Sequence, residues 1–443
     1  MLKTFTKGGV HPHEHKLTAG KKIEQLPLPE IVHIPLAQHL GVPAKVLVKK
    51  GDKVKTGQLI GQTEGFVSAN VHASVSGTVS KVDLFMDASG YRKMAVSIQV
   101  EGDEWVETID RSESLVPMAE ISSEDILKKV AEAGIVGLGG ATFPTHVKMT
   151  VPVGKKAEVV IINGVECEPY LTSDHSLMME KGPEIIVGVK LLMKALKVEN
   201  AWIGIEANKP DAIEHLTRCA AVDPRIKVQG LKVKYPQGGE KQLIKAVLNR
   251  EVPSGGLPID VGAVVFNVGS TFAVYEAVQK NKPLFERIIT VTGHDLKTPA
   301  NFRVRIGTLV SKLVEAAGGI PGSAGKVISG GPMMGKALAT PEVPVTKGSS
   351  GILVLPEEVT RRKPVEPCIR CAKCVSVCPM GLEPYLLMPL SERTQFERME
   401  KERVMDCIEC GSCSFICPAN RPLLDHIRYG KANVNKLIRS RKK

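Results

Sequence analysis

Hydrophobic and polar positions change their spacing several times along the chain, and each change marks a region with its own predicted structure. Residues 28–110 contain short stretches of β-forming residues separated by turns. The segment AKVLVKKGDKVKTGQLIGQTEG places Gly51 and Asp52 at a turn between two such stretches, and VHASVSGTVSKV continues the pattern. This spacing predicts a β domain at 28–110, preceded by an N-terminal extension at 1–27.

At residues 115–282 the pattern changes to helices alternating with short apolar strands. Ser122 and Asp125 fit a capping box at the start of a helix that ends at Gly134. The run VVII at 159–162 is continuously apolar, as in a strand covered on both faces. Further strands are expected at 201–205, 227–234 and 263–267, and helices near 183–197, 210–220, 239–250 and 271–280. The alternation predicts an α/β domain with a mostly parallel sheet.

Residues 285–356 contain two predicted strands, one helix and a glycine-rich turn, within ERIITVTG, FRVRIGTLVSKLVEAAGG and KVISGGPMMG. We expect a small α+β module there, of the soluble-ligand-binding, β-grasp-like kind. RRKPVEP has the composition of a linker. It leads into a ferredoxin-like helical segment at 361–430, which a basic tail at 431–443 follows. The 443-residue chain is therefore predicted to be a multidomain α/β and α+β protein.

The net charge of +12 is concentrated near the end of the chain, since residues 361–443 hold 17 basic and 9 acidic residues, a balance of +8. A basic surface favours an acidic protein, anionic lipid or nucleic acid as partner. Nucleic acid is the least favoured, because aromatic residues make up 4% of the chain and no recognised binding motif accompanies the charge. With no apolar run of about 18 residues and no signal-peptide core, we expect a cytoplasmic chain without a membrane span.

Eight of the ten cysteines lie at 368–417, in two runs of the form C-x2-C-x2-C-x3-C-P. This is the spacing of bacterial ferredoxins that hold two cubane [4Fe–4S] clusters, in which the fourth cysteine of each run binds the other cluster. Zinc is also held by four cysteines, but it would not need this run twice. The predicted ligand sets are Cys368, Cys371, Cys374 and Cys417 for one cluster, and Cys407, Cys410, Cys413 and Cys378 for the other.

A glycine-rich segment, GLGGATFPTHVK at 137–148, follows the first helix of the α/β domain. Its glycines allow backbone N–H groups to approach a phosphate or a planar ring, although such a loop alone is a tight turn as often as a ligand site. Three other polar segments each follow a predicted strand: NGVECEP at 163–169, YPQGGE at 235–240 and FNVGS at 266–270. Because open α/β sheets bind ligands at the carboxyl ends of their strands, these segments predict one shared crevice.

These four segments resemble the flavin-binding motifs of the NADH-oxidising subunit of respiratory complex I. Together with KGGVHPHEHK, VISGGPMMG and the duplicated cysteine run, they resemble the C subunit of the Rnf complex over nearly the whole chain. The β domain is similar to the barrel-sandwich hybrid of biotinyl and lipoyl carriers. No lysine occurs between Lys55 and Lys81 to carry such a group, so we expect this domain to be structural.

The resemblance implies that FMN and NAD(H) bind in the crevice. Phe143 and Glu168 match positions associated with the nicotinamide nucleotide. Three positions differ from the complex I pattern, which has arginine where Leu138 stands, an acidic residue where Val165 stands and glycine where Cys167 stands. The residues expected to hold FMN are Gly137, Gly139, Gly140, Lys148, Asn163, Glu166, Gly238, Gly239, Glu240, Asn267 and Ser270.

The resemblance also implies a subunit of a membrane-associated ferredoxin:NAD+ oxidoreductase that is coupled to sodium or proton translocation. A flavin would join the two-electron chemistry of NAD(H) to the one-electron chemistry of the clusters. The expected partners are other Rnf subunits, including integral membrane subunits and an iron–sulfur subunit, with ferredoxin acting indirectly. We expect peripheral attachment at the cytoplasmic face of the membrane. Two alternatives stay open: a flavin and iron–sulfur cobalamin reductase, and a structural electron relay without flavin.

Overall fold

A four-stranded parallel sheet forms the centre of the α/β domain in the computed structural model, which describes residues 1–441. Every pairing in this sheet is parallel, which confirms the prediction for the domain. The carboxyl ends of all its strands therefore lie at one edge. The strands lie in the order β11 (Ile226–Leu231), β10 (Asn200–Glu206), β9 (Val159–Asn163) and β12 (Ala263–Asn267).

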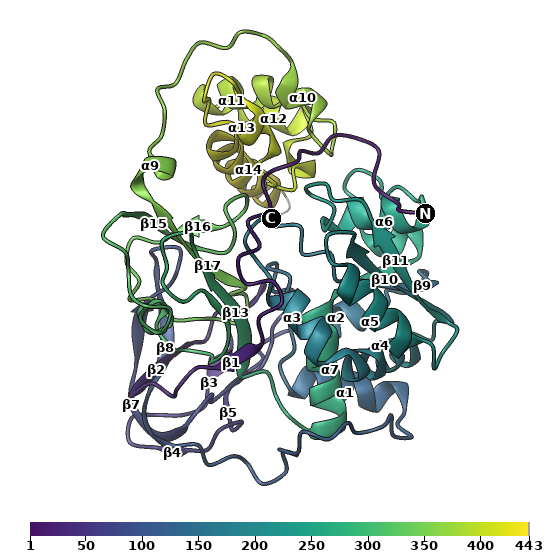
Figure 1. Ribbon diagram of the computed structural model, residues 1–443, viewed down its shortest axis with the longest axis vertical. Coiled ribbons are helices and arrows are strands. Elements are labelled where there is room, and N and C mark those ends of the chain that lie inside the picture. Colours follow the sequence, from purple (N-terminus) through teal and green to yellow (C-terminus); the bar gives the residue numbers. More distant parts are fainter. Residues whose placement is uncertain (442–443) are drawn as a thin grey trace.

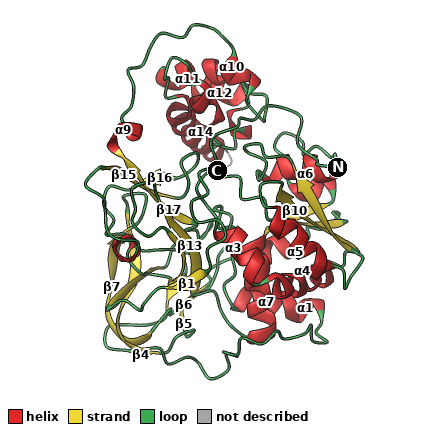
Figure 2. Ribbon diagram, viewed as in Figure 1, coloured by secondary structure: helices red, strands yellow, loops and turns green. Residues whose placement is uncertain are grey.

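Helices cover both faces of this sheet (Figure 2). Leu243 packs with Val159 and Ile161 on one face, whereas Val160 and Ile162 belong to the core on the other. Because successive residues of a strand point to opposite faces, the run VVII contributes side chains to the apolar cores on both faces of the sheet. The helices are α1 (Ser123–Glu132), α2 (Thr145–Met149), α3 (Ser173–Glu180), α4 (Gly182–Leu196), α5 (Pro210–Ala220), α6 (Glu240–Leu248) and α7 (Val268–Lys280).

One predicted strand of the sheet is shorter than expected. The strand predicted at 227–234 ends at Leu231. Beyond that residue the chain leaves the sheet and pairs with the N-terminal segment, where Val10 and Tyr235 exchange two backbone hydrogen bonds of 2.8 and 2.9 Å. The segment that pairs with the chain after Leu231 is therefore distant in sequence, and the local pattern of residues could not predict where the strand ends.

Polar side chains set the starts of two helices. Ser122 caps α1, as the capping box predicts. The helix expected at 271–280 begins earlier, at Val268, because the Asn267 side chain accepts the Gly269 N–H at 2.8 Å. An asparagine in this position satisfies a backbone donor that the first turn leaves free. The start of α7 therefore lies directly at the carboxyl end of β12.

Two small antiparallel sheets, β2-β8-β7-β4 and β3-β5-β6, form the β domain. Val32, Ile34, Ile60 and Ile98 are fully buried between them. Their core continues into the α/β domain, where it includes Ile126 of α1. The strands are β2 (Ile31–Pro35), β3 (Lys45–Val46), β4 (Lys53–Val54), β5 (Leu59–Gln62), β6 (Val71–His72), β7 (Ser76–Met86) and β8 (Arg92–Gly102).

The module at 285–356 is larger than the two strands and one helix expected from its sequence. Its sheet has six strands, accompanied by helix α8 (Val310–Ala316). One edge strand comes from the N-terminal extension, whose residues 23–25 pair in parallel with β14. The order is β1 (Ile23–Gln25), β14 (Ala300–Arg305), β13 (Glu286–Thr292), β17 (Gly351–Pro356), β15 (Ala324–Ser329) and β16 (Lys336–Ala337).

The cysteine-rich segment forms a group of helices at one end of the molecule, joined to the six-stranded sheet by a long loop (Figure 1). Part of the segment expected as a basic tail at 431–443 is helical, since α14 continues to Ser440, and the last two residues of that segment lie outside the described residues. The helical part is ordered by packing, because Val434 is fully buried and Ile438 packs against the same core. The helices are α9 (Glu357–Thr360), α10 (Lys373–Ser376), α11 (Pro384–Glu392), α12 (Phe396–Lys401), α13 (Ser412–Ile416) and α14 (Leu423–Ser440).

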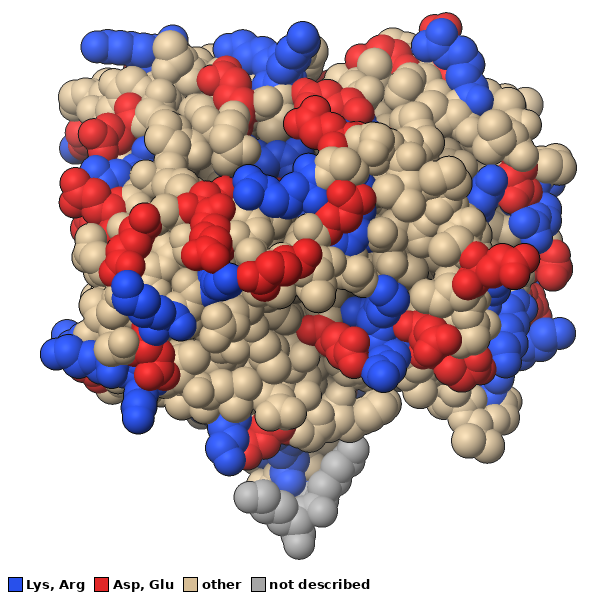
Figure 3. Space-filling model, turned by 90° about the horizontal axis from the view of Figure 1, so that it is seen from below, with Lys and Arg blue, Asp and Glu red and all other residues tan. Residues whose placement is uncertain are grey.

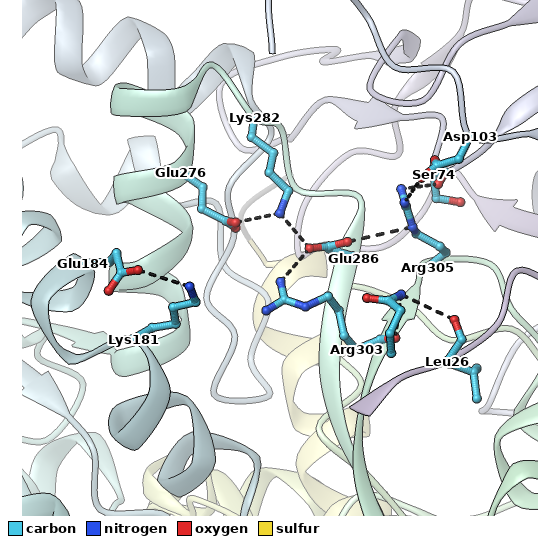
Figure 4. Close-up of polar contacts among 11 residues, drawn as sticks. Leu26, Ser74, Asp103, Lys181, Glu184, Glu276, Lys282, Glu286, Arg303 and Arg305 are labelled. Carbon is cyan, nitrogen blue, oxygen red and sulfur yellow. Dashed lines mark hydrogen bonds and ion pairs between the residues drawn. The ribbon is translucent and has the colours of Figure 1, made fainter. Parts of the chain in front are cut away.

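A buried ionic cluster joins the end of α7, the six-stranded sheet and the β domain (Figure 4). Glu286 Oε1 lies 2.6 Å from Lys282 Nζ and 2.8 Å from Arg303 Nη1. Further along the cluster, Arg305 Nη2 lies 2.7 Å from Asp103 Oδ2 of the β domain. Burial raises the pKa of Glu286, but the three surrounding cations outweigh it and hold this pKa below its usual range. The cluster therefore fixes β13 against α7 and the β domain.

The outer surface carries both signs of charge. On the face seen from below in Figure 3, Lys and Arg are interspersed with Asp and Glu rather than collected in one patch. Among residues 1–441, no helix is long and apolar enough to cross a membrane.

Candidate cofactor site

The glycine-rich loop after α1 closes as a tight turn. The Gly137 N–H donates to the Phe143 carbonyl at 2.9 Å, and Gly140 adopts a φ of +107°, which favours glycine. A Cβ on Gly140 would meet no atom within 4 Å, whereas one on Gly139 would lie 3.4 Å from the Asn267 Cβ. The loop is therefore open beside Gly140 and approaches the carboxyl end of β12 at Gly139.

Two asparagines end the neighbouring strands β9 and β12. Asn163 and Asn267 are partners in the register of these strands. Asn163 Nδ2 donates to the Gly238 carbonyl at 2.8 Å, and Asn267 Nδ2 donates to Asp174 Oδ2 at 2.7 Å. The structure thus brings NGVECEP, YPQGGE and FNVGS together at one edge of the sheet, beside the glycine-rich loop.

An ion pair and a buried thiol lie at the same edge. Lys148 Nζ of α2 lies 2.6 Å from Glu240 Oε1, at the start of α6. Gly239 precedes α6, and the N–H of Gly238 donates to Cys167 Sγ at 3.3 Å. Burial raises the pKa of the Cys167 thiol above its usual range. Cys167 therefore acts as a neutral, packed side chain that supports the YPQGGE segment.

The two glutamates of NGVECEP are engaged by the protein itself. Glu166 Oε1 accepts the Asp174 N–H at 2.8 Å at the start of α3. Glu168 accepts the N–H groups of Met333 and Met334 at 3.2 and 2.7 Å, and its burial raises its pKa to about 7. Glu168 is expected to contact the nucleotide, and in the structure its carboxylate accepts two hydrogen bonds from the turn of the six-stranded sheet.

The residues at this edge fit a phosphate-bearing planar cofactor such as FMN. Gly139 and Gly140 are exposed, so their backbone is accessible to a ligand. Ser270 lies beneath the loop in the first turn of α7, where its hydroxyl accepts the Leu138 N–H at 2.8 Å. The start of α7 and the Lys148 ammonium both favour an anion. Glu166, also expected to hold FMN, accepts the backbone N–H groups of Asp174 and His175 at the start of α3.

Four cysteines surround one cavity within the cysteine-rich helices. Cys378 comes from the first run, and Cys407, Cys410 and Cys413 come from the second. Apolar residues complete the wall of the cavity. Burial raises the pKa of Cys407 to about 11 and that of Cys413 to about 12, so a bound metal must stabilise their thiolate forms. We call these four residues the inner cysteine set, and their chemistry fits an iron–sulfur cluster.

The other four cysteines lie nearer the surface. Cys368 and Cys371 are exposed, whereas Cys374 and Cys417 are half-buried. Burial raises the pKa of Cys374, and the neighbouring Cys417 adds to that increase. We call these four residues the outer cysteine set. In the inner set, the structure brings the fourth cysteine of the first run to the cysteines of the second run. In the outer set, Cys417 of the second run lies near Cys374 of the first run.

The inner cysteine set borders the crevice of the α/β domain. Tyr235, in the YPQGGE segment, donates its hydroxyl proton to the Cys410 carbonyl at 2.8 Å. Val10 and Cys167 pack in the same apolar cluster as Tyr235 and Cys410. Cys410 of the inner cysteine set therefore contacts the YPQGGE segment of the crevice directly.

The N-terminal segment has contacts that sequence reasoning missed. It passes between the cysteine-rich helices and the α/β domain (Figure 1). A Cβ on Gly8 would lie 2.6 Å from the Cys378 carbonyl carbon. Lys16 Nζ donates to the carbonyls of Glu166 and Leu171 at 2.9 and 2.6 Å. The adjacent glycines Gly8 and Gly9 of KGGVHPHEHK indicate such a close approach of two backbone segments. From the sequence alone, this motif was used only for the family resemblance.

Relatives with curated names match almost the whole chain. The C subunit of the proton-translocating ferredoxin:NAD(+) oxidoreductase complex of Clostridium ljungdahlii is 47% identical over 98% of this chain and 94% of its own length. The C subunit of the Na(+)-translocating complex of Acetobacterium woodii is 47% identical over 97% of this chain and 96% of its own length. The corresponding C subunit of the ion-translocating oxidoreductase complex of Rhodobacter capsulatus is 42% identical, covering 98% and 84%. The chain belongs to the RnfC family.

Family models divide this RnfC chain into successive domains. The Nuo51 FMN-binding domain and the 4Fe–4S dicluster domain confirm the predicted FMN and iron–sulfur cofactors. The barrel sandwich hybrid match begins within the expected N-terminal extension, at residue 4. The matched ranges are 4–104 for the RnfC barrel sandwich hybrid domain, 130–276 for the FMN-binding domain, 288–337 for the SLBB domain and 360–418 for the dicluster domain.

A solved structure shares part of the fold. The NAD+-reducing [NiFe]-hydrogenase in its H2-reduced state matches with a TM-score of 0.50 and 20% identity, covering 72% of the RnfC chain and 64% of the hydrogenase chain. At this identity the likeness concerns the fold alone.

Proposed function

We propose that this chain exchanges a hydride between NAD(H) and FMN and passes single electrons through two [4Fe–4S] clusters, as a subunit of an ion-translocating ferredoxin:NAD+ oxidoreductase. The observation that carries the proposal is the 2.8 Å hydrogen bond from Tyr235 to Cys410, which joins the crevice to the inner cysteine set. It supports a short route for electrons within one chain. Relatives in the family are named as subunits of ferredoxin:NAD(+) oxidoreductase complexes.

The side chains of the crevice bind and orient rather than transfer protons. FMN, when bound, supplies the link between two-electron and one-electron chemistry. Phe143, at the end of the glycine-rich loop, is half-buried and lies on the side proposed for NAD(H). Glu166 and Glu168 support the pocket by holding α3 and the turn at Met333. The residues proposed to surround FMN are Gly137, Gly139, Gly140, Lys148, Asn163, Gly238, Gly239, Glu240, Asn267 and Ser270.

The two cysteine sets suggest an order for the clusters. The inner cysteine set borders the flavin crevice, so its cluster would exchange electrons with FMN. The outer cysteine set includes the exposed Cys368 and Cys371, so its cluster would exchange electrons with another protein of the complex. Crossed ligation follows from this arrangement, since Cys378 would bind the inner cluster and Cys417 the outer one.

Reduction by NADH tests the proposed function directly. We expect the anaerobically purified chain, loaded with FMN, to bleach its cluster absorbance after mixing with NADH, and to do so after the flavin is reduced. Stopped-flow spectroscopy at the flavin and cluster wavelengths measures both steps. Omitting FMN should leave the clusters oxidised while dithionite still reduces them. If the clusters stay oxidised after NADH is added to the FMN-loaded chain, even in the presence of partner subunits, the proposed NADH oxidation is wrong and the chain is only an electron relay.

We also propose peripheral attachment to other subunits at the membrane, through the basic cysteine-rich region. Such attachment depends on charge, and screening at about 1 M salt shortens the range of exposed charges to about 3 Å. High salt should therefore release the chain from membranes, as measured by immunoblotting of washed membranes. Release by detergent alone would argue against this attachment. The exposed basic residues of this region are Arg361, Arg362, Lys363, Arg370, Lys373, Arg393, Arg398, Lys401, Arg403, Lys436, Arg439 and Arg441.

A further inference from the structure

Leu138 lies in the glycine-rich loop, and its two backbone groups are held by different parts of the protein. Its N–H donates to Ser270 Oγ of α7 at 2.8 Å. Its carbonyl accepts a hydrogen bond from Arg287 Nη2 of β13 at 3.2 Å. Leu138 itself is buried, whereas the next two residues of the loop are exposed. The loop is therefore hydrogen-bonded to the protein interior through Leu138, immediately before the exposed residues Gly139 and Gly140.

The bond from Arg287 determines where the next backbone donor points. The Leu138 carbonyl and the Gly139 N–H belong to one planar trans peptide, so they point in opposite directions. Since the carbonyl points inward to the guanidinium, the Gly139 N–H points away from the interior. Gly140, which follows, has open space where a Cβ would lie. The inward bond thus presents the Gly139 N–H to the side on which a ligand can approach.

Arg287 is itself held firmly in the interior. It is 7% exposed, and its Nε donates to the Ser349 carbonyl at 3.1 Å. It lines a small cavity beneath the start of α7 together with Asp174, which binds Asn267 Nδ2 at 2.7 Å. Burial lowers the pKa of Arg287 to about 10, with the Asp174 charge acting against that shift, so the guanidinium stays charged at neutral pH.

We propose that Arg287 is a positioning residue for the flavin, which holds the Leu138 carbonyl and so directs the Gly139 N–H toward FMN. This rests on the proposed function, because it assigns a further residue to the same crevice. Arg287 lies outside residues 130–276, which match the FMN-binding domain, and belongs to the six-stranded sheet. The six-stranded sheet therefore contributes directly to the flavin site.

Two substitutions of Arg287 test this role in the full chain with its clusters loaded. Arg287→Met removes both hydrogen bonds, and we expect the Kd for FMN, measured by quenching of flavin fluorescence, to rise about tenfold or more. Deuterium uptake of the peptide covering 134–143, measured without FMN, should rise in the same variant. Arg287→Lys keeps a charged donor but lacks the planar, forked guanidinium. Its Kd for FMN and its deuterium uptake at 134–143 should therefore lie between those of the parent and those of Arg287→Met.

Arg303→Met is the matched control, because Arg303 is a half-buried arginine on the adjacent strand β14 that lines the same cavity but binds Glu286. It should lower the melting temperature while leaving the Kd for FMN and the uptake at 134–143 at parental values. A parental Kd and parental uptake in Arg287→Met would overturn the inference, as would an equal loss of FMN affinity in Arg303→Met. Failure of the parent chain to bind FMN would instead overturn the proposed function.

Discussion

Replacing Gly139 with phenylalanine is expected to abolish FMN binding and, with it, the reduction of the clusters by NADH. A Cβ at this position would already lie 3.4 Å from the Asn267 Cβ, so the remaining atoms of a large side chain must fill the space between the loop and the end of β12. We expect the Kd for FMN to rise at least about 100-fold, which corresponds to about 2.7 kcal/mol. Fluorescence titration with FMN and stopped-flow mixing with NADH measure the two effects.

Two glycine variants make this prediction specific. Gly139→Ala adds a single carbon at ordinary contact distance and should retain most of the FMN affinity. Gly322→Phe places the same large side chain at a glycine with no atom within 4 Å of its Cβ position, outside the segments that form the crevice, and should behave as the parent. Dithionite should reduce the clusters in all three variants. Parental FMN affinity in Gly139→Phe would show that the flavin does not use this loop.

Replacing Cys378 with alanine is expected to remove the cluster of the inner cysteine set and to leave that of the outer set. Cys378 lines the same cavity as Cys407, Cys410 and Cys413, although it belongs to the first run. Iron content should fall from about eight to about four atoms per chain, as expected for loss of one cubane. Because the inner cluster borders the crevice, NADH should no longer reduce the remaining cluster, whereas dithionite should. Electron paramagnetic resonance of the reduced protein identifies which signal is lost.

Single-cysteine variants provide the comparison. The spectrum of Cys378→Ala should match that of Cys407→Ala, from the inner cysteine set, and differ from that of Cys371→Ala, from the outer set. Cys417→Ala should in turn match Cys371→Ala. If Cys378→Ala instead loses the signal that Cys371→Ala loses, each run binds its own cluster and the crossed arrangement is wrong.

Elements with strong local patterns agree best with the structure. The apolar run at 159–162 and the segment at 263–267 coincide with β9 and β12 to within one residue, because strands buried on both faces need continuous apolar sequence. The helix at 210–220 coincides with α5, which begins at a proline and has apolar residues on one face. Short elements were missed, as for α2 and α3, because few residues carry too weak a periodic signal.

Elements that depend on distant partners were harder to predict. β1 is ordered by the edge of β14, and its three residues show no strand pattern of their own. β17 was not predicted although its residues are apolar. Its strand conformation depends on pairing with β13 and β15, which are distant in sequence. Helix α14 continues to Ser440, into the expected basic tail, because Val434 is buried against the cysteine-rich helices.

The sequence by itself determined the cofactor chemistry, because the spacing of eight cysteines and the glycines of the flavin motif are local properties of the chain. It also located the parallel sheet whose edge carries the site. Tertiary structure alone decided that Tyr235 meets Cys410, that Glu168 binds the turn at Met333, and that Arg287 reaches the Leu138 carbonyl. These contacts join residues of different domains, and their geometry depends on how the domains pack, which no local spacing of apolar and polar residues encodes.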